Sequence, residues 1–131
     1  MSPHDNDPWQ RWTARLLAVL AADPSDQLAW AREHQVRTAA VAEDVEFVLR
    51  LAESMAERGT LATDTLQDLK AIDRLVRAVD ARGRTDLWAG SLTADVIWSE
   101  VRTTARRVLV ARLDDWRLPL PRRVAPQHVY D

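Results

Sequence analysis

Residues 38–59, TAAVAEDVEFVLRLAESMAERG, carry the strongest structural signal in the chain. Apolar residues recur there every three or four positions, which is the spacing that aligns side chains on one face of an α-helix. These residues are Val41, Val45, Val48, Ala52 and Met55, and we expect Phe47, Leu49 and Leu51 to widen the face. Thr38 is suited to cap the start of this helix, and Gly59 is suited to end it. The stretch therefore predicts a long helix with one face in a core.

The same periodicity occurs in two further long segments. The first, TDTLQDLKAIDRLVRAVDARG, begins at Thr63 and ends at Gly83. The second is the last long helix of the chain, which we expect to begin at Ser91 or Thr93. Both segments predict amphipathic helices with apolar faces in the same core. The residues expected to face the core are Leu66, Leu69, Ile72, Val76 and Val79 in the first segment, and Ile97, Val101, Ala105, Val108 and Leu109 in the second.

The N-terminal part of the chain predicts two shorter helices. Asp7 and Pro8 are suited to the N-cap and first position of a helix that begins there. This helix should stop near Pro24, because the residue before a proline is pushed out of the helical region. Ser25 is suited to cap a second, short helix that ends near His34.

The remaining segments predict a loop and a tail. Residues 84–92, RTDLWAGSL, lack helical spacing and predict a loop, and three prolines after Trp116 prevent further helix. We therefore expect an all-α protein, a compact bundle of four to five helices with an extended Pro/Arg-rich C-terminal tail. Its expected parts are an N-terminal tail over 1–7, a helical bundle domain over 8–116 and the C-terminal tail over 117–131.

Residues 31–47, AREHQVRTAAVAEDVEF, resemble a DNA-binding helix-turn-helix in part. Residues of the expected kind stand at tolerable spacings at Ala31, Val36 and Val41. Gln35, however, occupies the turn where glycine would ease a positive φ. The second helix would also expose three carboxylates to the phosphate backbone, which attracts lysine and arginine instead. These acids are Glu43, Asp44 and Glu46. We therefore interpret the segment as a corner between two packed helices.

The chain offers little of what a catalytic or metal site requires. It has no cysteine and three histidines, of which His4 and His128 lie in predicted tails and His34 ends a helix. Its three glycines are scattered, and no glutamate precedes a histidine by three residues as in metal sites of helical bundles. We therefore expect no catalytic residue, no metal and no cofactor, and we lean towards a protein that is not an enzyme.

Six tryptophans stand against one phenylalanine and one tyrosine. Most lie near helix ends, where a large amphipathic ring closes a core. Trp9 and Trp88 are the better candidates for exposed anchors, because one lies in the first predicted turn and the other in the predicted loop. The alternative for Trp88 is that it dips into the core together with Leu87.

Positive charge gathers towards the C-terminus. Residues 1–59 hold ten acids and six bases, whereas residues 102–131 hold three acids and seven arginines. Such charge either steers an acidic partner or is neutralised by acidic helices within the bundle. Guanidinium groups suit carboxylate recognition, and tryptophan is a frequent binding anchor. The candidate partner-binding residues are Arg102, Arg106, Arg107, Arg112, Arg122 and Arg123, with Trp116, Trp88 and Trp9 as anchors.

These observations favour a small, non-catalytic protein-interaction module of the accessory, inhibitor or immunity type. We expect it to occupy an acidic surface of a protein partner. The alternative is a ligand-binding regulator or small helical-bundle enzyme with a small apolar ligand between tryptophans. Nucleic-acid binding by the basic last helix ranks third. No apolar run approaches the roughly 18 residues of a membrane span, and no signal peptide is evident, so we expect a cytoplasmic protein without membrane contact.

Overall fold

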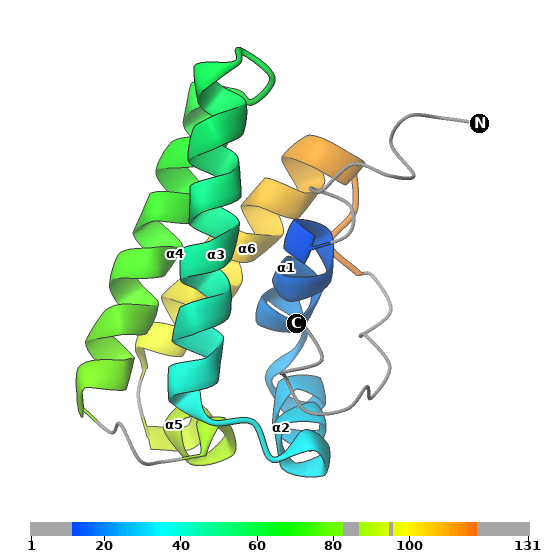
Figure 1. Cartoon of the computed structure of the whole chain (residues 1–131). Helices are drawn as coiled ribbons and strands as arrows, with labels where there is room; N and C mark the ends of the chain where they lie inside the picture. The colour runs from blue at the N-terminus through cyan, green and yellow to red at the C-terminus, as the bar shows by residue number, and fades with distance from the viewer. Residues whose placement is uncertain (1–11, 83–86, 95, 118–131) are drawn as a thin grey trace.

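The computed structural model describes residues 12–82, 87–94 and 96–117 of the chain. In these ranges the regular secondary structure is helical (Figure 1), apart from one isolated β-bridge between Arg37 and Leu87. The predicted all-α bundle is confirmed, with one helix more than the largest number predicted. The helices are α1 (Ala14–Ala21), α2 (Pro24–His34), α3 (Thr38–Glu57), α4 (Thr63–Arg82), α5 (Trp88–Ala94) and α6 (Ile97–Leu113).

The hairpin of α3 and α4 is the longest part of the bundle (Figure 1). α4 begins at Thr63, as predicted, whereas Thr38 is the first residue of α3 and not its cap, because Arg37 occupies the N-cap position. Gly59 follows α3 with a φ of 75°, a left-handed conformation that glycine adopts without strain. The backbone N–H and the hydroxyl group of Thr60 both donate to the Met55 carbonyl at 2.9 Å. These bonds occupy a carbonyl that the end of α3 would otherwise leave open.

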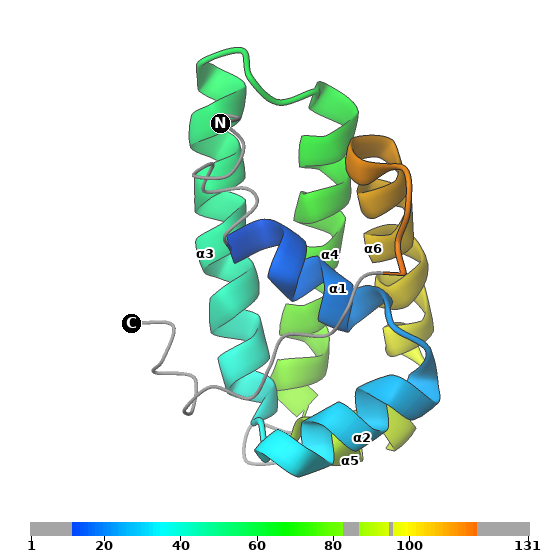
Figure 2. The same cartoon turned by 90° about the vertical axis from the view of Figure 1, so that its right-hand side faces the viewer.

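The core lies where α6 packs against both α4 and α1 and where α3 covers α4. Figure 2 shows α1 crossing the bundle, with α2 and α5 together at one end. The main apolar stripes predicted for the long helices are confirmed, with only Leu66 and Ile97 partly exposed among them. The wider face predicted for α3 is wrong at Phe47, which is 47% exposed, while Leu49 and Leu51 are partly exposed. In the described ranges, no helix combines the length and the apolar character that a membrane crossing requires. Six residues predicted to be buried together are at most 4% exposed: Val45, Val48, Leu69, Ile72, Val101 and Val108.

The corner between α1 and α2 forms close to the predicted place. α1 ends at Ala21, and Ala22 is extended with ψ at 159°. α2 begins at Pro24 with Asp23 as its N-cap, so the prediction that Ser25 caps this helix is wrong. The reason is that the fixed φ of proline suits the first helical position. The cap predicted for α1 at residues 7–8 lies outside the described residues.

The loop predicted over 84–92 is wrong for its second half, because α5 occupies Trp88–Ala94. The helix is held at its start by the Trp88 backbone N–H, which donates to the Val36 carbonyl at 2.7 Å. The last long helix accordingly begins at Ile97 rather than at Ser91 or Thr93. A helix of seven residues that includes a glycine is too short for a periodic pattern to emerge.

A short corner joins α2 and α3 through Gln35, Val36 and Arg37. Gln35 has φ 51° and ψ 47°, the left-handed conformation for which the sequence offers no glycine. α2 ends at His34, and the Val36 N–H donates to the Ala31 carbonyl at 3.4 Å across the turn. α3 then continues for 20 residues with its apolar side against α4.

Candidate functional site

The structure brings only some of the candidate residues together. Arg102, Arg106 and Trp116 come together near the corner between α1 and α2, whereas Arg107 points to α4. Trp88 lies apart from them, at the start of α5. Arg112 is partly buried in the last turn of α6. Three further candidates, Arg122, Arg123 and Trp9, lie outside the described residues.

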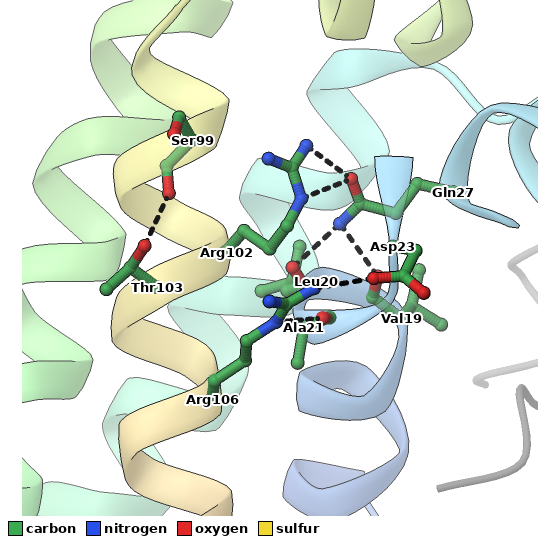
Figure 3. A network of polar contacts seen from close by, with 9 residues as sticks. All are labelled: Val19, Leu20, Ala21, Asp23, Gln27, Ser99, Arg102, Thr103 and Arg106. Atoms are coloured by element: carbon green, nitrogen blue, oxygen red, sulfur yellow. Dashed lines mark hydrogen bonds and ion pairs between the residues drawn. The ribbon is translucent and has the colours of Figure 1, made fainter. Parts of the chain in front are cut away.

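Gln27 of α2 is a polar side chain at the centre of the first group, and it is only 1% exposed. Its Nε2 atom donates to the carbonyls of Val19 at 3.0 Å and Leu20 at 2.7 Å, at the end of α1. Its Oε1 atom accepts from Nε and Nη2 of Arg102 at 3.2 and 2.8 Å (Figure 3). A buried amide needs such partners, and here they join three helices. Gln27 therefore holds the guanidinium group of Arg102 in place.

Arg106 lies one turn after Arg102 and binds the same corner. Its Nε atom donates to the Ala21 carbonyl at 2.8 Å, and its Nη2 atom contacts Oδ1 of Asp23 at 3.1 Å (Figure 3). A cation is favourable at the carbonyl end of a helix. Together with Gln27, this arginine thus satisfies the last three carbonyls of α1.

Trp116 joins the group because the chain turns sharply after α6. Asp114 adopts a φ of 66°, and its N–H donates to the Val110 carbonyl at 2.9 Å. The Cζ atoms of Arg106 and Arg117 lie 3.7 and 4.9 Å from the centre of the partly exposed indole ring. Cation–π contacts of this kind contribute about 0.5–1 kcal/mol each at exposed sites. We name this group the arginine–tryptophan face, defined as Arg102, Arg106, Trp116 and Arg117.

The positive charge of this face is only partly neutralised. Both hydrogen bonds of Arg102 go to the neutral amide of Gln27, while Arg106 contacts the carboxylate of Asp23, whose side chain is 59% exposed. Burial lowers the pKa of Arg102, and the charge of Arg106 lowers it further, whereas Asp23 acts in the opposite direction. The face therefore keeps positive charge that an anionic group can use.

Arg107 is on α6 too, but it is committed to the bundle. Its Nε and Nη2 atoms donate to the two carboxylate oxygens of Asp68 at 3.0 and 2.9 Å. These hydrogen bonds, and then the charge of Asp68, raise the pKa of Arg107. A two-point pair of this geometry links α6 to α4. For Arg107, the basic charge is thus neutralised by an acidic residue within the bundle, which is one of the two alternatives that the sequence allowed.

Trp88 is not an exposed anchor, and this interpretation of the sequence is wrong. The side chain is 0% exposed and lies edge-on to Trp30 and Trp98, with ring centres 6.0 and 5.6 Å apart. Leu87, the other residue that was expected to dip into the core, is 44% exposed. Burial of the large ring is favoured because the end of the bundle formed by α2 and α5 would otherwise expose the core.

Within the described ranges, the acidic residues of α3 do not contact the arginine–tryptophan face and differ from one another in pairing and burial. Glu46 contacts Arg50 at 3.1 Å and Arg77 of α4 at 3.7 Å. Asp44 is half-buried, and burial, followed by repulsion from Glu43, raises its pKa to about 7. Of the three acids predicted to face DNA, only Glu43 is exposed, because Glu46 pairs with two arginines and Asp44 is half-buried. The segment still offers acid where a DNA reader offers lysine and arginine, so DNA readout remains unfavoured.

Asp44 makes the stability of the protein pH-dependent. Because its folded pKa of about 7 is above the ordinary 3.8, the folded state binds an extra proton between these pH values. This contribution to stability is fully present below about pH 3.8 and is lost as the pH rises towards 7. We expect Asp44→Asn to unfold at higher urea concentration than the parent at pH 8, with little difference at pH 4. Glu53→Gln, at an exposed position of α3, is the control and should show no such trend. Parallel pH profiles for Asp44→Asn and the parent would contradict the assignment.

Two important members of the site were missed from the sequence. Gln27 shares helical spacing with the buried Ala31 and His34, so periodicity marks it as inward-facing, although its polarity conceals this. Asp23 precedes a proline at a helix start, which indicates a cap but no contact with α6. No group of three or more potential metal-binding side chains is found in the described part of the chain. The chain matches no protein family, no curated protein and no solved structure.

Proposed function

We propose that this protein is a non-catalytic interaction module that binds an acidic surface of a partner protein through the arginine–tryptophan face. The observation that carries the proposal is the charge of Arg102, held against the α1–α2 corner by a neutral amide instead of a carboxylate. Arginine and tryptophan also dominate the residues that contribute most to protein interfaces. An acidic partner would supply the carboxylate contact that Arg102 does not make within the protein.

The anchoring of the face supports the same function. Arg102 and Arg106 bind atoms of two other helices, and Trp116 stacks on Arg106. Side chains already held in one orientation lose less entropy when a partner binds. The face is therefore suited to recognition by preformed geometry.

We further propose that the partner is met in the cytoplasm, where the protein acts as an accessory, inhibitor or immunity-type factor. The lack of cysteine is compatible with a reducing compartment. Because the proposed mode of action is the covering of a partner's surface, it requires no cofactor.

The test uses a fluorescently labelled oligoglutamate peptide as the probe. Arg117→Ala should weaken binding about three- to tenfold, because the change removes one cation and its contact with Trp116. Arg50→Ala is the matched control, since this arginine is 72% exposed but lies on α3. Fluorescence anisotropy at two salt concentrations measures both affinities.

Two results would contradict the proposed function. One is an equal loss of affinity in Arg117→Ala and Arg50→Ala, which would mean that the probe responds to net charge alone. The other is tighter, salt-sensitive binding of duplex DNA that depends on Arg102 and Arg106, which would favour a nucleic-acid function.

A further inference from the structure

Arg102 and Arg106 are two like charges on one side of α6. They are four residues apart, so their side chains are neighbours on the helix, and both extend to the α1–α2 corner (Figure 3). Like charges at this spacing repel each other. The arrangement therefore favours an anion that contacts both groups.

The ion pair between Arg106 and Asp23 is weak by comparison with another on the same helix. Arg106 makes a single contact with the Asp23 carboxylate at 3.1 Å, and that side chain is 59% exposed. Arg107 holds both oxygens of Asp68, whose side chain is 20% exposed. An exposed one-point pair is easily exchanged, whereas a two-point pair has defined geometry.

Asp23 can leave Arg106 without disturbing the fold. Its backbone carbonyl accepts the Gln27 N–H at 2.9 Å, so the main chain is held independently of the side chain. Arg106 also keeps its hydrogen bond from Nε to the Ala21 carbonyl. Rotation of one exposed carboxylate into solvent is thus sufficient to open the contact.

We propose that Arg106 and Arg102 form a binding site for a carboxylate group of the partner protein, and that Asp23 is an internal competitor for it. This inference rests on the proposed function and names the chemical group that the face recognises. The partner's aspartate or glutamate replaces Asp23 on Arg106 and also gives Arg102 a carboxylate contact, which it does not have within the protein. The affinity of the protein for its partner is therefore lowered by its own Asp23, which must first leave Arg106.

The test compares two substitutions that change the net charge equally. Asp23→Asn removes the competing negative charge and keeps a residue type that is favourable at the N-cap position of α2. Asp26→Asn is the matched control, an exposed acid in the first turn of the same helix that makes none of these contacts. At physiological salt, Asp23→Asn should bind oligoglutamate about two- to fivefold more tightly than the parent, the range of an exposed ion pair. The gain in affinity for Asp26→Asn should be less than half of the gain for Asp23→Asn.

A second readout does not depend on overall affinity. In NMR spectra the Nε–H signals of Arg102 and Arg106 should shift when oligoglutamate is added, and the Arg107 signal should stay in place. Equal affinities of Asp23→Asn and Asp26→Asn, or unshifted signals, would overturn the proposal that Asp23 competes for a carboxylate site at Arg102 and Arg106. The proposed function would still stand in that case if Arg117→Ala weakens binding. Absence of binding in both the parent and Asp23→Asn would overturn both proposals.

Discussion

Val101→Asp is expected to abolish cooperative unfolding. Val101 is 0% exposed in the middle of α6, where this helix packs against α1 and α4. An unpaired carboxylate at this position loses its hydration and costs several kcal/mol, against a total stability of about 5–15 kcal/mol for a domain. Urea denaturation followed by circular dichroism should then show a gradual loss of helix without a sigmoidal transition.

The control for this prediction is the same substitution on the other side of the helix. Val110 is 45% exposed, so Val110→Asp should change the free energy of unfolding by no more than about 0.5 kcal/mol. Ile72→Asp on α4, at a position 1% exposed, should behave like Val101→Asp. A Val101→Asp protein that melts like the parent would place α6 outside the core and contradict the fold.

Trp88→Ala is expected to have the second largest effect, a loss of about 3–5 kcal/mol in the free energy of unfolding. The side chain is among the largest that are fully buried, and it lies between Trp30 and Trp98. Its removal leaves a cavity that neighbouring rings of fixed shape fill poorly. The transition midpoint in urea and the thermal midpoint should both fall.

Phe47→Ala is the matched control for this substitution, since the phenylalanine is 47% exposed on α3. We expect it to cost clearly less, because much of the ring already contacts water. Trp88→Ala should leave the affinity for oligoglutamate unchanged where the protein remains folded. Unchanged stability combined with lost binding would restore Trp88 as an exposed anchor and contradict its position in the structure.

The arginine–tryptophan face was only partly predictable from the sequence. The number of arginines near the C-terminus and their helical spacing were evident, and these placed Arg102 and Arg106 on one side of a helix. Their partners were not evident, because Gln27 and Asp23 lie 75 and 83 residues away in the chain. Composition likewise gave Arg106 and Arg107 the same role, although one contacts the α1–α2 corner and the other Asp68 of α4.

The sequence by itself determined the long helices, because their causes are local. Apolar spacing and glycine stops act within a few residues, so the start of α4 at Thr63, the start of α3 within one residue and the buried stripes of both helices followed from them. The tertiary structure alone decided the place of Trp88 and the partners of the arginines. α5 is a short helix whose burial is imposed by α2 and α6, and hydrogen bonds between distant segments exist only once the helices have packed.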